Sequence, residues 1–166
     1  MLNSIFVIVP ISSILALSFA YFFYKQMIKS PEGTEKMQTI AKHVRKGAFA
    51  YLKQQYKVVL IVFLILSAIF SFMAYVLGIQ NGWVPVAFLT GGCFSALAGF
   101  FGMKTATSAS ARVANACRKS LNGGLKLAFR SGAVMGLVAV GLVLADISFW
   151  FLVLNHFIEE MDSGYK

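Results

Sequence analysis

The residues that could perform acid–base or metal chemistry are few and widely separated in this chain of 166 residues, which has six acidic residues, two histidines and two cysteines. Glu32 and Glu35 lie in one polar stretch, His43 stands among basic residues, and His156 lies near the end of the chain. Magnesium needs several hard oxygen ligands, and phosphoryl transfer needs metal ions that clamp the transferred group. Two carboxylates in one loop do not supply such a site. We therefore predict no catalytic, cofactor-binding or metal-binding residue in this segment.

Three further residues have a reactive or ionisable side chain within or beside an apolar stretch of sequence. Cys93 and Cys117 have no metal-ligand spacing and no paired framework, so we interpret them as small packing residues. Asp146 interrupts an apolar run, and an acid within a membrane helix is a functional candidate. It lies about 24 Å along a helix from Arg130, which places it toward the outer boundary of a membrane. An interfacial or buried hydrogen-bonding role is the favoured interpretation, and a role in ion transport stays open.

Long apolar runs must position these side chains. Hydrophobic residues make up 58% of the chain and charged residues only 13%, and the twenty residues from Val58 to Leu77 contain no charge. A run of that length crosses a hydrocarbon layer about 30 Å thick as a helix. We therefore predict an all-α, multi-pass integral membrane protein with four transmembrane helices. Their expected spans are about residues 2–24, 58–77, 84–103 (continued into the cytoplasm to about residue 118) and 125–151.

The distribution of basic residues predicts the orientation. The net charge is +9, and fourteen of the fifteen Lys and Arg fall in two segments, residues 25–57 and 104–130. Such clusters favour the cytoplasmic side, which predicts a cytoplasmic basic loop over residues 25–57 and an N-out, C-out topology. The same clustering favours topology and the lipid bilayer over nucleic acid as the reason for the positive charge. Residues 30–32 (Ser-Pro-Glu) predict a helix start, and the amphipathic helix that follows either lies on the membrane surface or extends the second span.

Small residues mark the third and fourth spans. Gly92 and Gly99 share one helical face, and Gly132 and Gly136 form a GxxxG pair. Small residues let a neighbouring backbone approach closely, so we predict that both faces pack tightly within the protein. Residues 122–124 (Asn-Gly-Gly) are expected to break the helix that extends the third span.

Three stretches resemble one family, the membrane-integral, ion-translocating pyrophosphatases that pump protons or sodium. These stretches are GAFAYLKQQYK at residues 47–57, GGCFSALAGFFGMKTATSASARVANA at 91–116 and GLKLAFRSGAVMGLVAVGLVL at 124–144. Their order and spacing agree with the family over roughly residues 36–150. The chain resembles the N-terminal portion of such a pump, the first four of about sixteen helices.

The resemblance implies a homodimer in a bacterial inner membrane that hydrolyses magnesium pyrophosphate and exports sodium or protons. It implies Mg2+ as a cofactor of the whole pump and leaves K+ or Na+ open as a further one. In the family the pyrophosphate site and the ion gate are built from the fifth and later helices, so no site residue is carried over to this chain. The four spans then correspond to outer helices that support a catalytic ring, and the segment alone is expected to be inactive.

A second hypothesis is a self-contained four-helix membrane scaffold or assembly protein without catalysis. The small-residue faces favour the first hypothesis, because they suit contacts with further helices. Sodium or proton specificity, potassium dependence, and whether the chain is a truncated record, a split subunit or a complete protein stay open at the sequence level.

Overall fold

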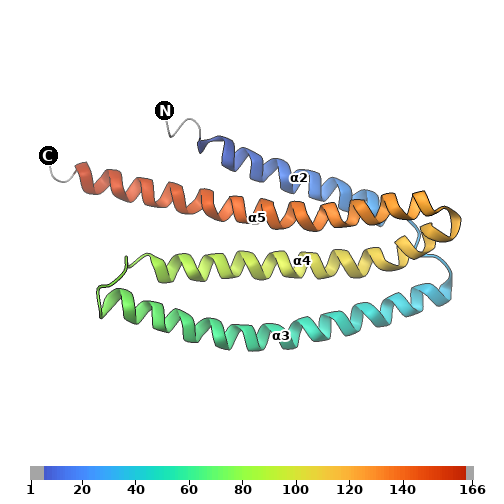
Figure 1. Cartoon of the computed structure of the whole chain (residues 1–166), viewed down its shortest axis with the longest axis horizontal. Helices are drawn as coiled ribbons and strands as arrows, with labels where there is room; N and C mark the ends of the chain where they lie inside the picture. The colour runs from blue at the N-terminus through green and yellow to red at the C-terminus, as the bar shows by residue number, and fades with distance from the viewer. Residues whose placement is uncertain (1–5, 164–166) are drawn as a thin grey trace.

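The protein is built from long helices only, over the part of the chain that is described. The computed structural model describes the backbone of residues 6–163 and the side chains of residues 6–155. Within these residues, four helices are long and apolar enough to cross a membrane, which confirms the predicted all-α membrane class. They are α2 (Ile8–Ile28), α3 (Glu35–Tyr75), α4 (Val84–Lys119) and α5 (Leu121–Ser163) (Figure 1).

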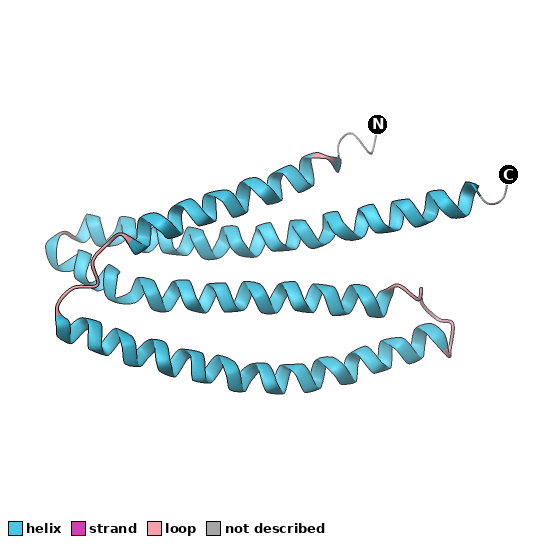
Figure 2. Cartoon of the chain, turned by 180° about the vertical axis from the view of Figure 1, so that it is seen from behind, coloured by secondary structure: helices cyan, strands magenta, loops and turns pink. Residues whose placement is uncertain are grey.

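The helices form an open row instead of a closed bundle. Their spatial order is α2, α5, α4, α3, and the connections lie at alternate ends of the row (Figures 1 and 2). The extensive contacts are those of α5 with α2 and with α4, and of α4 with α3, whereas α2 and α4 touch over a short length. Because α2 and α3 form the two edges, both broad faces of the row are left for lipid or for other helices.

Three helices are far longer than a membrane is thick. At 1.5 Å per residue, α3, α4 and α5 are about 62, 54 and 64 Å long, against a hydrocarbon layer of about 30 Å. The excess of α3 and α4 lies at the end of the row where residues 29–34 connect α2 to α3 and where α4 meets α5, which we call the basic end because the two basic segments collect there. α3 is continuous from this end into the apolar run, so the amphipathic segment extends the second span and is not a separate surface helix.

The predicted helix start at residues 30–32 is wrong by several residues. α3 begins at Glu35, after Thr34, whose hydroxyl accepts a hydrogen bond from the amide of Met37 at 3.5 Å. Gly33 has φ of +100°, a conformation that ends any helix and that residues with a side chain rarely adopt. Thr34 followed by an acidic residue in the first turn is itself a helix-start pattern. The helix begins at this pattern and not at residues 30–32, because the backbone conformation of Gly33 interrupts any helix between the two.

The predicted break between the third and fourth helices is present, but it lies at Ser120, two residues before residues 122–124. The chain turns at Ser120, which has extended dihedral angles, and all three residues lie in the first turn of α5. The Ser120 hydroxyl accepts a hydrogen bond from the amide of Gly123 at 3.3 Å, so one serine ends α4 and caps α5. A Cβ on Gly124 would lie 3.1 Å from the Cα of Cys117. This glycine therefore permits the close reversal of the chain instead of breaking a helix.

Small residues bring some helices together and leave others open. A Cβ on Gly92 would overlap the ring of Phe63 in α3, and Ser13 of α2 donates a 2.7 Å hydrogen bond to the carbonyl of Gly141 in α5. In contrast, Gly132 and Gly136 have no neighbouring atom within 4 Å of a built Cβ. Among the four described helices this GxxxG pair therefore has no packing partner, and its tight packing against further helices stays a prediction.

Candidate functional site

A group of polar side chains at the basic end ties the α2–α3 connection to α4. Glu32 forms ion pairs with Arg112 of α4, at 2.8 Å, and with Arg45 of α3. The Arg112 Nε also donates a 3.0 Å hydrogen bond to the carbonyl of Ser30. Arg112 and Glu32 keep only 11% and 18% of their side-chain area exposed, so this pair is largely shielded from water. We call Glu32, Arg45 and Arg112 the arginine–glutamate cluster.

Two amides complete the attachment of this connection. Asn115 donates a 3.2 Å hydrogen bond to the carbonyl of Pro31, and Gln38 donates a 3.0 Å bond to the carbonyl of Gly33. Together with the bond from Arg112 to Ser30, three carbonyl groups of this non-helical segment thereby accept hydrogen bonds from side chains. The connection is consequently held in one conformation, and its acid, Glu32, is engaged by two guanidinium groups instead of being free for a metal ion.

The other chemically reactive residues stay apart from this cluster. Glu35 and His43 are exposed on α3, and Cys93 and Cys117 are free and exposed on α4. Within the described residues, no group of three or more His, Cys, Asp or Glu side chains could hold a metal ion. The side chain of His156 lies outside the described part. The prediction of no site residue in this chain stays a prediction.

Asp146 lies between α4 and α5 near the end of the row opposite the basic end. Its Oδ1 atom is buried and has no hydrogen-bond partner among the described residues, and its Oδ2 atom faces Gly91, 3.4 Å from where a Cβ would stand. One turn further along α5, the Trp150 Nε1 donates a 2.7 Å hydrogen bond to the hydroxyl of Thr90. The absence of a side chain at Gly91 leaves the space in which the carboxylate sits. Asp146 and Trp150 of α5 therefore both face α4, as a buried role for Asp146 requires.

The comparison with protein families gives the decisive observation. The model of the family described as inorganic H+ pyrophosphatase matches residues 14–165, which is nearly the whole chain. The chain belongs to this family. The match extends through all four helices, so the open row is a part of the family's fold and not an unrelated arrangement of membrane helices.

Individual relatives of the family are described as pyrophosphate-energized pumps. A Bacteroides thetaiotaomicron protein, a "putative K(+)-stimulated pyrophosphate-energized sodium pump", is 67% identical over 151 residues, which cover 91% of this chain and 21% of that protein. A Moorella thermoacetica "K(+)-insensitive pyrophosphate-energized proton pump 2" is 38% identical, covering 89% of this chain and 21% of that protein. A Thermotoga maritima "K(+)-stimulated pyrophosphate-energized sodium pump" is 34% identical, covering 96% and 21%. This chain thus spans about a fifth of the length of the curated relatives it matches.

Sequence reasoning missed the arginine–glutamate cluster and the contact between Trp150 and Thr90. The sequence places Arg112 in a run of small residues, a weak signal that this arginine points into a packed helix contact. Its partner, Glu32, lies eighty positions earlier, and no local pattern connects the two. The pyrophosphatase family of membrane proteins is correctly recognised from the three quoted stretches.

Proposed function

We propose that these residues form the N-terminal, outer-helix portion of a pyrophosphate-energised ion pump. The pump would couple hydrolysis of magnesium pyrophosphate to export of an ion across the bacterial inner membrane. The observation that carries the proposal is the family match over residues 14–165, together with relatives described as pumps that are about five times longer. A chain that spans so little of its relatives supplies a part of their machinery.

The open row supports a wall-like role within the pump. In the most apolar stretch of eighteen residues in each helix, only 6–17% of the residues are buried within the described chain. Gly132 and Gly136 present a bare backbone strip on α5. Such strips suit close packing by another helix, because lipid tails gain nothing from glycine. We infer that further helices of the same pump, and in a homodimer those of a second subunit, cover one face of the row while lipid covers the other.

The orientation that fits this role is N-out and C-out. Fourteen of the fifteen Lys and Arg lie in the two segments that form the basic end, which in this orientation faces the cytoplasm. The arginine–glutamate cluster would then brace the cytoplasmic extensions of α3 and α4. The magnesium ions would be held by other helices of the pump, because Glu32 is engaged by two arginines and the described residues offer no cluster of metal ligands.

Among the ions pumped by relatives, we favour sodium. The relative at 67% identity is described as a potassium-stimulated sodium pump, while the proton pump compared above is 38% identical. On this basis potassium would stimulate the whole enzyme. The residues that select the ion would lie outside these four helices.

The test compares two kinds of sealed vesicle. The first kind is made from cells that express the gene together with its downstream coding region, and the second contains residues 1–166 alone. We expect magnesium-dependent release of phosphate from pyrophosphate, and sodium uptake into inverted vesicles, from the first kind only. Phosphate release by residues 1–166 above an empty-vector control would refute the assignment of a supporting role. No hydrolysis in either kind would favour the alternative, a membrane scaffold without catalysis.

A further inference from the structure

A narrow apolar groove runs between α2, α4 and α5. Its volume is about 360 Å³, and its lining includes Leu17, Ala20, Tyr21, Val134, Val138 and Leu142. The groove follows α5 from Val134 to Leu142, which is about 12 Å along the helix axis. It lies in the apolar part of the row, beside the small cluster of Met27, Ala109 and Leu127 that closes the three helices at the basic end.

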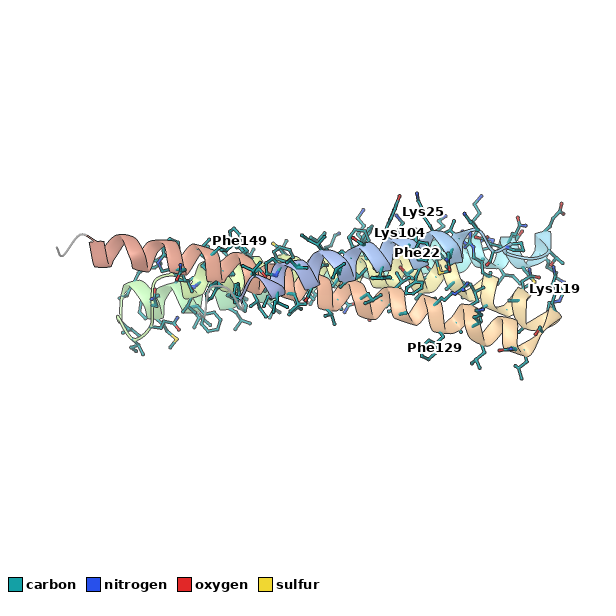
Figure 3. The ribbon with its side chains drawn as sticks, turned by 90° about the horizontal axis from the view of Figure 1, so that it is seen from above. Phe22, Lys25, Lys104, Lys119, Phe129 and Phe149 are labelled. Carbon is teal, nitrogen blue, oxygen red and sulfur yellow. The ribbon has the colours of Figure 1, made fainter. Side chains whose placement is uncertain are left out.

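Two lysines stand at one end of this groove. Lys104 of α4 lines the groove beside Tyr21, and the ammonium group of Lys25 lies 4.7 Å from the centre of the Tyr21 ring. Both lysines are exposed, and no ion pair joins either of them to a carboxylate within residues 6–155. Figure 3 shows Lys25, Phe22 and Lys104 gathered at the same side of the row. The groove therefore combines an apolar interior with a doubly positive mouth.

The lysines lie at the depth where lipid phosphates are expected. Lys104 is twenty residues from the start of α4 at Val84, which is about 30 Å and matches the thickness of a hydrocarbon layer. Lys25 directly follows the apolar part of α2, and Tyr21 and Tyr24 provide the interfacial aromatic residues that accompany such a boundary. The two helices run in the same direction, and each thus places a lysine at the same membrane level.

The charge at the mouth of the groove favours an anionic lipid as its occupant. Such a lipid brings a phosphate to the level of Lys25 and Lys104 and an apolar chain to the groove beside them, whereas an apolar helix would leave both lysines without a counter-ion. A single file of methylene groups packs favourably against the leucine and valine side chains of the lining.

We propose that this groove binds an anionic phospholipid, with one acyl chain between α2, α4 and α5 and the phosphate at Lys25 and Lys104. Basic pockets between transmembrane helices on the cytoplasmic side bind anionic headgroups in this way. The bound lipid would fill the space between α2 and α4, which touch each other directly only over a short length. The inference rests on the groove and its charges, and it does not depend on the proposed pump activity.

Native mass spectrometry of the protein as its gene encodes it, purified in detergent, tests this site with phosphatidylglycerol and phosphatidylcholine of the same acyl chains. We expect phosphatidylglycerol to bind preferentially. Each of Lys25→Gln and Lys104→Gln should weaken it about fivefold, and the double variant about 25-fold, given the usual contribution of a basic residue near a charged lipid surface. The matched control is Lys42→Gln with Lys46→Gln, two exposed lysines on α3, which lies at the other edge of the row.

The acyl chain is tested separately at Val138. Val138→Phe narrows the groove without a change of charge and should lower phosphatidylglycerol binding, whereas a phosphate held at the lysines alone would be unaffected. A photoreactive residue at position 138 should label phospholipid in membranes. Equal binding of the two lipids, an equal effect of the α3 control, or a crosslink from position 138 to another helix of the protein would each overturn the proposal.

Discussion

Replacement of Gly92 by alanine tests the packing of α3 against α4. The three atoms nearest to a Cβ at this position all belong to the Phe63 ring, and each would be closer than 3.0 Å. The ring has little freedom to move away, because Phe63 stacks on Phe88 with 4.4 Å between the ring centres. Phe88 in turn meets the edge of Phe70 at 5.0 Å. The added methyl group must therefore displace an aromatic ring that is fixed by its neighbours.

The expected cost follows from two opposing contributions. Forcing an extra methyl group into a packed site costs about 1–3 kcal/mol, and loss of an aromatic pair costs about 0.5–1.5 kcal/mol. Alanine in place of glycine stabilises a helix by about 0.8–1.0 kcal/mol. We therefore expect Gly92→Ala to lower the free energy of unfolding by about 2 kcal/mol, within a range of about 0.5–3.7 kcal/mol.

The assay is unfolding of the chain of residues 1–166 in mild detergent by added dodecyl sulfate, followed by the fluorescence of Trp83 and Trp150. The matched control is Gly132→Ala, a second helical glycine that has open space around it. We expect the control to be neutral or slightly stabilising. In a Phe63→Leu background, Gly92→Ala should lose most of its effect. If Gly92→Ala and Gly132→Ala behave alike in the unmodified background, α3 does not pack on α4 through Phe63.

Three further predictions follow from the basic end and from the orientation. Gly33→Ala should lower the thermal midpoint of the chain, because φ of +100° costs about 1–2 kcal/mol for a residue with a Cβ; an unchanged midpoint would contradict this conformation. Arg112→Gln should destabilise the chain by about 2 kcal/mol through loss of charged hydrogen bonds, while the exposed Lys119→Gln should have no measurable effect. In a cysteine-free background, a membrane-impermeant maleimide added to intact cells should label a cysteine at Gln80 but not one at Ser30, and the reverse pattern would refute the N-out topology.

The number and character of the membrane helices follow from the sequence. Runs such as Val58–Leu77 are uncharged over a membrane's thickness, and this property alone decides that they are helices in lipid. The ends of the helices are less predictable, because several residues compete as caps. Ser120 ends α4 two residues before the Asn-Gly-Gly sequence, since its hydroxyl caps α5 and Gly124 allows contact with Cys117.

The arrangement of the helices could not be predicted from local patterns. Glycine on a helix indicates a close approach without identifying the neighbour: Gly92 faces Phe63, whereas Gly132 faces open space. Glu32 and Ser30, two partners of Arg112, are distant from it in sequence, because such pairing depends on which segments lie side by side in the fold. The cavity between α2, α4 and α5 likewise arises from three segments that meet only in the folded chain.

The most direct test of the supporting role asks what covers the open glycine face of α5. Residues 1–166, with a photoreactive amino acid at position 136, would be expressed together with the rest of the pump as a second, tagged chain. We predict that illumination crosslinks position 136 to the second chain in membranes that hydrolyse pyrophosphate. Crosslinks to lipid alone in such active membranes would contradict the central claim that these helices form a wall of the pump.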